Sequence, residues 1–484
     1  MRQDLLWNQN TDSPRQILQI CRKVLVIIIL TRNVPSLIAL DWARKGYSLA
    51  AAAFATPTIL AASVPSSLRY CTLPVAGAAY ESVPAAALNI DQDILNKAVG
   101  DANPSGKLAI QVFRNNCLLS TNQTSALTDQ DRKNLFSAAK GVIGILTGIA
   151  FDQGKLKLDD PIDKYLPSTA GWGDAAHRAI TIRQLLQETA GLDKGVFSEG
   201  ITFLLDPSLP QQALAMKFVT PAGEAFQYSQ RVPDLLAYVV SRAVGQELQA
   251  FAQANLFTPL GIAKTQYIWF KDNSGNSYGY AHLYLTPDNF ARLGLMMQNG
   301  GVYSNSRVLS QTWVDLVSVP SEHNGCYGML FWTNRGDTCI SPTGYPFQRS
   351  WLPSAPRDLF AMSGSPQQKN FMIPSLNMTV SWMEVTPGKG PPADIWYKFF
   401  KTLMPGVRDL PPFDPKTYEM EPSGLNATLE ALSLSVLLGN LLSSPQCNIV
   451  ICNADISLLG ILGNLGGLLK LTGATITALL RLGW

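Results

Sequence analysis

The sequence predicts an α+β domain in which an antiparallel β-sheet is flanked by helices. Short apolar segments with strand character occur near both ends of the central region, and helical patterns occupy the sequence between them. Strands and helices do not alternate regularly, as they would in a parallel sheet with crossover helices. Together these observations favour a sheet built from the two ends of the domain, with the helices inserted between them.

The individual elements follow from local patterns. Residues 107–113 and 117–120 are apolar segments on either side of an Arg-Asn-Asn turn, which predicts a hairpin. Residues 371–374 and 378–383 predict a second pair of strands across a short turn. Helical spacing of apolar residues predicts helices over residues 233–245 and 247–257. Local patterns with cap and stop residues predict further helices over residues 91–103, 137–152, 181–191, 286–300 and 395–403.

Composition bounds the class of protein. The chain has 484 residues, of which 46% are hydrophobic and 15% charged, so it can bury a sizeable core. This length accommodates one domain of about 250–300 residues with extensions, or two to three smaller ones. The formal net charge is +3, without a basic tract, which argues against nucleic acid as a partner.

Changes in composition divide the chain into three parts. Residues 1–85 contain a positive flank, Arg44-Lys45, followed by the uncharged, Ala-rich stretch 46–68, which resembles a signal sequence or membrane anchor. Residues 86–410 contain the strand and helix patterns expected of a compact domain. Residues 411–484 form an apolar extension rich in Leu and Gly. We therefore expect an N-terminal targeting or membrane-anchor region, a central domain and a C-terminal extension.

The N-terminal pattern predicts a secreted or membrane-anchored protein, with mitochondrial targeting or a disordered extension as the alternatives. Glycosylation sequons at Asn122, Asn377 and Asn426 favour export and predict a glycoprotein. Membrane association is expected through residues 46–68 or through the C-terminal tail, where residues 456–480 approximate one apolar helical face. The alternative for the tail is a helix that packs on the central domain.

The cysteines and histidines argue against a metal centre. None of the seven cysteines forms a C-x-x-C pair, and the chain has only three histidines. In an exported protein, Cys326–Cys339 and Cys447–Cys452 are candidate disulfides. The alternative is that these side chains are buried free thiols.

A candidate nucleophile opens the helix that begins near residue 137. Ser137 and Lys140 are three residues apart and therefore share one face of that helix. A serine hydroxyl needs a base to become a nucleophile, and a lysine amine can serve if burial lowers its pKa. The helix N-terminus favours negative charge that develops beside it. Tyr228 follows a turn-rich stretch and is a candidate relay for the proton of Ser137, or else an ordinary half-buried tyrosine.

The order of further motifs extends this hypothesis. Ser137-Ala138-Ala139-Lys140 is followed by 154–161, 180–192, Tyr228-Ser229 and further short matches as far as Trp332. Over residues 88–405 the chain resembles the serine β-lactamase-related family, which groups class C β-lactamases, penicillin-binding proteins, esterases and nylon-oligomer hydrolases. The resemblance implies a β-lactamase/transpeptidase-like fold with an inserted helical subdomain.

The resemblance also implies roles for individual residues. Ser137 is expected to be acylated, Lys140 to be its base or base activator, and Tyr228 to be the second proton carrier. The reaction would need neither a metal nor an organic cofactor. The substrate would be a small-molecule ester or amide.

The family's third motif, Lys-Thr-Gly or His-Thr-Gly, matches the stretch Met362-Ser363-Gly364-Ser365, with Gln368 after it. Gly364 keeps the close backbone approach. The N–H groups of Ser365 and Ser137 would form an oxyanion hole. Met362 cannot supply the motif's usual cation for a substrate carboxylate.

A second departure is Gln230, where asparagine is usual. Its amide can still bond Lys140 or the substrate. Both departures favour an esterase or amidase that acts on an uncharged acyl group over a β-lactamase.

Two alternatives compete with this hypothesis. A catalytically silent binding or scaffold protein on the same fold would also tolerate Met362 and Gln230. The stretch Gly275–Gly279 matches a Gly-x-Ser-x-Gly nucleophile elbow around Ser277, with Asp315 and His323 in the order of an α/β-hydrolase. That elbow requires a helix immediately after it, whereas the following residues have an extended pattern.

Overall fold

A computed structural model describes most of the chain beyond residue 67. The described residues are 68–104, 106, 108–122, 131–194, 199, 203, 206–365, 367–384, 394–410 and 416–421. They all belong to the compact unit that begins at Ser67, whereas the other unit, Met1–Ser66, lies outside them. The expectations for residues 46–67, for Asn426, for Cys447–Cys452 and for the apolar tail also lie outside the described residues.

A six-stranded antiparallel sheet forms the centre of the domain. Its order is β2-β1-β13-β12-β11-β8, which places the N-terminal hairpin beside the strands from the end of the domain. Arg114 in β1 pairs with Met378 in β13, and Leu108 pairs with Glu384. The predicted hairpins at both ends of the domain are therefore confirmed. The strands are β1 Leu108–Arg114, β2 Cys117–Asn122, β8 Trp332–Thr333, β11 Phe360–Gly364, β12 Gln368–Ile373 and β13 Met378–Glu384.

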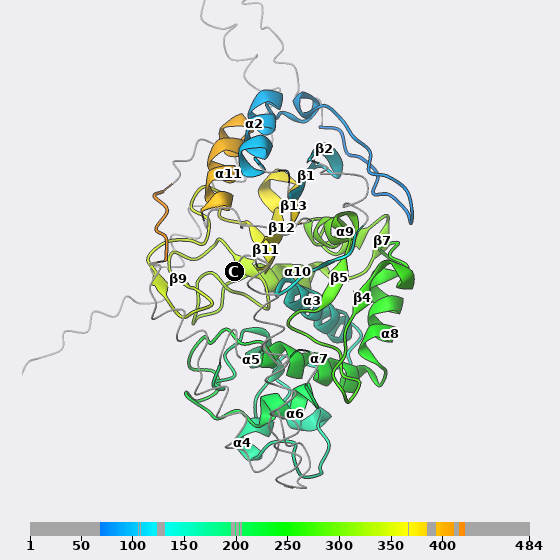
Figure 1. The fold of residues 1–484 in the computed structure, drawn as a ribbon, viewed down its shortest axis with the longest axis vertical. Helices are drawn as coiled ribbons and strands as arrows, with labels where there is room; N and C mark the ends of the chain where they lie inside the picture. Colours follow the sequence, from blue (N-terminus) through cyan, green and yellow to red (C-terminus); the bar gives the residue numbers. More distant parts are fainter. Residues whose placement is uncertain are drawn as a thin grey trace, which may run out of the picture. The chain divides into compact units, whose positions relative to one another are not determined.

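Helices cover both faces of this sheet (Figure 1). On one face, α2 (Gln92–Ala102) packs against α11 (Ile395–Leu403). On the other face, α3 (Ala138–Asp152) contacts β11, and α9 (Pro287–Gln298) contacts β12 and β13. Strand residues alternate between the two cores: Ile110 and Val112 of β1 belong to the first, and Ala109 and Phe113 to the second. The prediction of an α+β domain with flanking helices is confirmed.

A helical part lies beyond α3, on the side away from the sheet (Figure 1). It contains α7, the longest of its helices, against which α5 and α6 pack. A capping box of Thr181 and Gln184 begins α5, because each side chain bonds the backbone N–H of the other residue. At its other end α7 stops at Gly245, whose φ of 70° suits glycine. The helices here are α4 Ala175–Arg178, α5 Ile182–Leu186, α6 Leu209–Leu214 and α7 Arg231–Val244.

Smaller elements complete the domain. The helix predicted over 247–257 is present, but its second half widens into a π-helix at Gln253–Phe257 after α8 (Leu248–Ala252). A helix that the periodicity did not predict, α10, spans Gln311–Ser318. The short strands are β3 Lys133–Asn134, β4 Ile268–Trp269, β5 Leu283–Leu285, β6 Val302–Tyr303, β7 Ser306–Arg307, β9 Cys339–Ile340 and β10 Pro346–Phe347.

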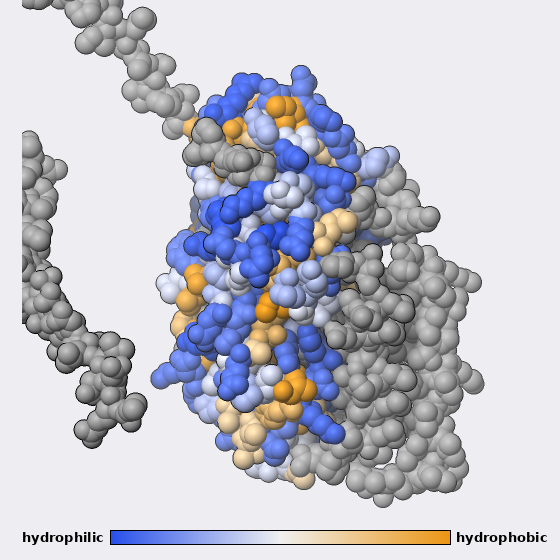
Figure 2. Space-filling model, turned by 90° about the vertical axis from the view of Figure 1, so that its left-hand side faces the viewer, coloured by the Kyte–Doolittle hydropathy of each residue, from blue (hydrophilic) through white to orange (hydrophobic). Residues whose placement is uncertain are grey.

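Two disulfides cross-link the domain. Cys326–Cys339 was predicted. Cys71–Cys117, which joins β2 to the segment ahead of α2, was not predicted. Because Leu73 is buried in the main core, packed structure begins ahead of the boundary expected at residue 86. The coloured residues of Figure 2 are mainly hydrophilic, with scattered apolar residues among them. Within the described ranges, no helix is both long and apolar enough to cross a membrane.

Candidate active site

Ser137 lies at the turn that begins α3. It is the N-cap residue of that helix, and Phe136 immediately before it has a φ of 47°, in the left-handed region that a side chain of this size rarely adopts. The side-chain oxygen of Asn134 accepts a hydrogen bond of 2.9 Å from the N–H of Phe136. This strained turn is therefore held from one side by Asn134 and from the other by the helix.

Lys140 is buried one turn further along α3, with 1% of its surface exposed. Its Nζ donates a 2.6 Å hydrogen bond to Oε1 of Gln230 and lies 3.7 Å from the centre of the Tyr228 ring. Oε1 of Glu188 is 3.9 Å away, which is a loose ion pair. The bond between Lys140 and Gln230 confirms that the longer amide still reaches the lysine.

Two buried glutamates hold the segment Tyr228–Gln230 from behind. Glu188 accepts a 2.5 Å hydrogen bond from the N–H of Ser229. Glu199 accepts one of 2.5 Å from the N–H of Gln230 and one of 3.0 Å from the Ser229 hydroxyl. Burial raises the pKa of Glu188 to about 7, although the Lys140 charge opposes the shift. Burial also raises the pKa of Glu199.

Strand β11 brings Gly364 against the start of α3. A β-carbon added to Gly364 would lie 2.1 Å from the carbonyl oxygen of Leu135 and 3.2 Å from the backbone nitrogen of Ser137. Only glycine fits this approach. Ser365 follows directly, so its N–H lies in the chain segment that faces the Ser137 turn.

These residues border a pocket of about 740 Å³. Ser137, Tyr228, Gly364 and Ser365 line it, together with aromatic residues that include Trp332. The rings of Trp332 and Trp351 stack with centroids 5.6 Å apart, and Tyr228 lies 6.0 Å from Trp332. The wall beside the candidate nucleophile is therefore aromatic and suits an apolar group. Further lining residues are Cys339, Ile340, Ser341, Pro342, Phe347, Arg349, Trp351, Ser363, Lys369, Trp396, Tyr418, Met420 and Glu421.

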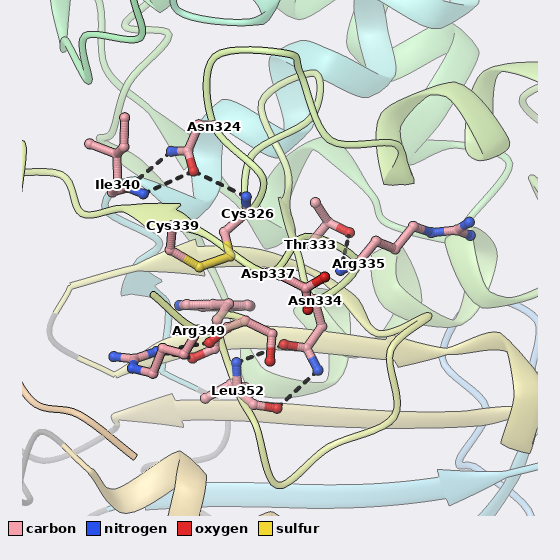
Figure 3. Close-up of a disulfide and its surroundings, with 12 residues drawn as sticks. Asn324, Cys326, Thr333, Asn334, Arg335, Asp337, Cys339, Ile340, Arg349 and Leu352 are labelled. Carbon is pink, nitrogen blue, oxygen red and sulfur yellow. Dashed lines mark hydrogen bonds between the residues drawn. A yellow bond between two sulfur atoms is a disulfide. The ribbon is translucent and has the colours of Figure 1, made fainter. Parts of the chain in front are cut away.

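The disulfide Cys326–Cys339 supports one wall of this pocket (Figure 3). The side chain of Asn324 lies behind the bridge and bonds both segments that the bridge joins. Its Oδ1 accepts hydrogen bonds of 3.0 Å from the N–H groups of Cys326 and Ile340, and its amide donates to the Ile340 carbonyl at 2.9 Å. The wall is thus fixed by a covalent link and three hydrogen bonds.

The outer rim of the pocket comes from a strap, residues 416–421. The guanidinium of Arg349 donates to the Glu419 carbonyl from Nε at 2.9 Å and from Nη2 at 2.7 Å. The same guanidinium lies between the rings of Phe347 and Tyr418, 4.2 and 4.3 Å from their centroids. The strap is therefore clamped to the pocket by a buried cation.

Comparison with known proteins identifies the family. The β-lactamase family model matches residues 108–396, more than half of the chain. The chain belongs to the β-lactamase family.

Individual relatives are more distant. The 6-aminohexanoate-dimer hydrolase of Paenarthrobacter ureafaciens is 25% identical over 265 residues, which is 50% of this chain and 63% of that protein. Esterase EstB of Burkholderia gladioli is 33% identical over 144 residues, or 26% of this chain and 36% of that protein. The chain thus matches less than two thirds of the length of either relative. A solved structure from Bacteroides dorei, named as a candidate β-lactamase, has a TM-score of 0.51 at 18% identity and covers 66% of this chain and 100% of its own, a likeness of fold.

The structure brings most of the predicted residues of this family member together. Lys140 and Gln230 lie directly behind the pocket that Ser137, Tyr228, Gly364 and Ser365 line. Gln368 does not join them. Its side-chain oxygen accepts a 3.0 Å hydrogen bond from the N–H of Glu384 across the sheet, and Lys369, the next residue, lines the pocket instead.

The sequence did not predict four charged residues of the site: Glu188, Glu199, Arg349 and Lys369. Glu188 lies in the segment 180–192, which the sequence motifs had singled out, but its role depends on its burial, which the local sequence does not show. Arg349 and Lys369 have no local motif. Met362, which replaces the expected cation, packs on α3, since a β-carbon at Gly141 would lie 2.9 Å from its Cγ.

The alternative Gly-x-Ser-x-Gly elbow does not assemble a triad. The Ser277 hydroxyl accepts a 3.1 Å hydrogen bond from Gln249. His323 is paired with Glu322 at 3.3 Å, and Asp315 accepts from Gln311 at 2.8 Å. Gly275–Gly279 lies in a turn that leads to β5, not to a helix. In the described part of the chain, no group of three or more His, Cys, Asp or Glu side chains is arranged to hold a metal ion.

Proposed function

We propose that this protein is a serine hydrolase that cleaves an ester or amide through an acyl-enzyme on Ser137. The observation that carries the proposal is the arrangement of Ser137 at the pocket, with Lys140 buried one helical turn behind it against the Tyr228 ring. The names of the hydrolase and esterase relatives support the same class of reaction.

The first step would be attack by Oγ of Ser137 on the substrate carbonyl carbon. The hydroxyl proton would pass to the Lys140–Tyr228 pair, which lies on the same side of the pocket. Negative charge would develop on the carbonyl oxygen. The N–H groups of Ser137 and Ser365, on either side of the close approach at Gly364, would stabilise that charge.

Collapse of this intermediate breaks the bond to the leaving alcohol or amine, which takes its proton from Tyr228. The acyl group is then bound to Ser137 as an ester. Water attacks that ester in the second half of the reaction, releases the carboxylic acid and restores the Ser137 hydroxyl. The proton that Ser137 loses leaves with the alcohol or amine, and a proton from the attacking water replaces it, so the steps require no reactant besides the substrate and water.

Glu188 and Glu199 would act as positioning residues. Their carboxyl oxygens fix the backbone of Ser229 and Gln230, and this in turn sets the Tyr228 ring and the Gln230 amide against Lys140.

The test is the intact mass of the purified protein after exposure to a fluorophosphonate probe, compared with Ser137→Ala. We expect one adduct in the wild type and none in the variant. Ser277→Ala is the matched control and should label like the wild type. Absence of labelling in folded wild-type protein would contradict the proposal and favour the silent binding or scaffold protein. Labelling that persists in Ser137→Ala would show that a residue other than Ser137 is the nucleophile.

We also propose that the protein folds in an oxidising compartment, as expected for a secreted or membrane-anchored protein. The support is the pair of disulfides, Cys71–Cys117 and Cys326–Cys339, since such bridges persist mainly outside reducing compartments. Thiol counting by mass spectrometry on protein from its native source tests this. Four free thiols at these positions would contradict it.

A further inference from the structure

Lys369 is a buried lysine in the wall of the candidate active-site pocket. It lies in β12 and pairs with Ser363 of β11, so the two side chains project from the same face of the sheet. Both line the pocket that contains Ser137, and Trp396 of α11 lines it beside them. The pocket therefore reaches from the aromatic wall around Trp332 to a second polar region next to β11.

The ammonium group of Lys369 has few partners for a buried charge. The residue is 2% exposed, and its Nζ donates a 2.5 Å hydrogen bond to the Gly364 carbonyl. It also lies 4.1 Å from the centre of the Trp396 ring. Among the described residues no carboxylate forms an ion pair with it, and burial alone lowers its pKa to about 7. A lysine ammonium carries three donors, so two remain after the bond to Gly364.

Trp396 adds a second unsatisfied donor to this region. Its indole Nε1 is buried and has no hydrogen-bond partner in the described part of the chain. Buried donors without partners are uncommon in folded proteins, so the indole N–H and the remaining donors of Lys369 leave hydrogen-bonding capacity for an acceptor in this region. An ammonium and an indole N–H together suit an anionic oxygen ligand.

The other cation of the pocket, Arg349, is committed to structure. Its guanidinium donates to the carbonyl oxygens of Ser350, Trp351 and Glu419, and two aromatic rings enclose it. Lys369 is therefore the better candidate for recognising a ligand. Arg349 thus has the several carbonyl partners expected of a cation with a structural role, whereas Lys369 donates to one carbonyl.

Gly364 links the Lys369 side chain to the turn that carries Ser137. The carbonyl of Gly364 accepts from Lys369, and a β-carbon added to Gly364 would lie 2.8 Å from the backbone nitrogen of Ala138 and 3.2 Å from that of Ser137. An anion bound by Lys369 would thus lie in the same pocket as the carbonyl that Ser137 attacks. In this buried region a charge-assisted bond gains strength, since water does not screen it.

We propose that Lys369, with Trp396, forms a carboxylate-binding subsite, and that the preferred substrates are esters or amides that carry a carboxylate near the scissile bond. This inference rests on the proposed hydrolase function and names its substrate class. It also revises the expectation of an uncharged acyl group, because the cation that Met362 does not supply comes from the neighbouring strand. A lysine that only supports the Gly364 carbonyl is the alternative.

Two matched pairs of substrates test the subsite. Mono-p-nitrophenyl glutarate and its methyl ester place the charge on the acyl side. The compounds 4-acetoxybenzoate and methyl 4-acetoxybenzoate place it on the leaving group. For one pair, the wild type should show a KM lower by about tenfold or more for the carboxylate member, as expected for a bond between charged groups. Equal KM values within both pairs would overturn the proposal.

Variants assign the preference to the lysine. Lys369→Met should abolish the carboxylate preference, so that kcat/KM falls about tenfold more for the carboxylate member of the pair than for the neutral ester. Lys369→Arg should keep part of the preference, because it retains the charge. Lys398→Met is the matched control: this lysine is exposed on α11 and paired with Asp394, and its loss should leave the preference intact. A Lys369→Met variant that lost activity equally on both members of the pair would support the structural alternative instead.

The outcomes separate this inference from the proposed function. Fluorophosphonate labelling of Ser137 reports the nucleophile and needs no carboxylate. Wild-type protein that labels but shows no preference in either pair would retain the proposed function and overturn the subsite. Wild-type protein that does not label would overturn both. If Lys369→Met does not fold, the wild-type comparison and Lys369→Arg still decide the question.

Discussion

Two buried charged clusters lie on either side of the start of α7, and they differ in how completely their charges are satisfied. In the Arg231 cluster, the guanidinium pairs with Asp206 at 2.7 Å and with Asp234 at 2.8 Å. The Tyr278 hydroxyl and the backbone N–H of Gly279 complete the hydrogen bonding of the two aspartates.

The Lys140 cluster is formed by Lys140, Glu188, Tyr228 and Gln230. Its last member, Gln230, directly precedes Arg231 in the chain. Its lysine has one short hydrogen bond, to Gln230, a loose ion pair at 3.9 Å and an aromatic ring. Tyr228 reaches the pocket, whereas the Arg231 cluster does not line it. A closed network of ions stabilises a fold, and a partly satisfied one beside a pocket is available for proton transfer.

The largest effect that would sharpen this comparison is expected from Lys140→Met. Loss of a proton acceptor typically costs up to about 10⁴-fold in rate, so kcat/KM should fall by about 10³- to 10⁴-fold. The free energy of unfolding should change far less than for the Arg231 cluster, because a loosely paired charge leaves the core. Ester hydrolysis and urea denaturation of the same preparation measure both. A variant that unfolds but keeps its activity per folded molecule would contradict the assignment.

Arg231→Met should show the opposite behaviour. Removing the guanidinium leaves Asp206 and Asp234 buried without their shared cation, which should lower the free energy of unfolding by about 3–5 kcal/mol. The rate per labelled Ser137 should stay within about threefold of the wild type. Arg242→Met, on the exposed end of α7, is the control and should change stability by less than about 0.5 kcal/mol. Equal effects of the two arginine variants would break the comparison.

Glu188→Gln tests the electrostatics of the Lys140 cluster through pH. The pKa of Glu188 is raised from 4.5 to about 7, so between these values the folded protein holds a proton that the unfolded chain has lost. The wild type should therefore lose stability as the pH rises through this window, by about 3 kcal/mol in total. Glu188→Gln cannot ionise and should lack that loss. Denaturation curves at pH 4.5 to 8 with parallel trends would contradict the raised pKa.

The smallest effect is expected from Gln230→Asn. The shorter side chain withdraws the acceptor from Lys140 by one methylene and breaks the 2.6 Å hydrogen bond. Such a bond to a charged group contributes about 1.5–3 kcal/mol, so kcat/KM should fall by about 10- to 150-fold. A loss as large as that of Lys140→Met would mean that Gln230 takes part in the reaction directly. Steady-state ester hydrolysis distinguishes the two.

Local patterns were sufficient for the parts of the site that depend on local geometry. Ser137 and Lys140 share a helical face because of their spacing, and apolar segments on either side of short turns predicted both hairpins. The carboxyl groups behind Tyr228 could not be predicted this way. Glu188 and Glu199 come from separate loops, and each lies at the site only because the tertiary fold buries it there.

Gln368 and Lys369 show how sensitive such inferences are to strand orientation. Successive side chains of a strand point to opposite faces of the sheet, so Gln368 and Lys369 project from opposite faces of β12. The motif was extended to Gln368, whereas Lys369, which pairs with Ser363, is the one of the two that lines the pocket. Sequence spacing alone does not fix which of two neighbours that is. The Cys71–Cys117 bridge is similar, because it joins residues 46 positions apart whose proximity follows from the sheet.

The strap over residues 416–421 has a practical consequence for recombinant work. A shortened protein ending at residue 410 would keep the sheet and every helix described above, and it would still contain Ser137. It would also lack one side of its pocket, because Tyr418, Met420 and Glu421 belong to the lining. Substrate profiles measured on that shortened form would describe a wider opening than the full-length protein has. The working boundary for expression therefore lies beyond Glu421.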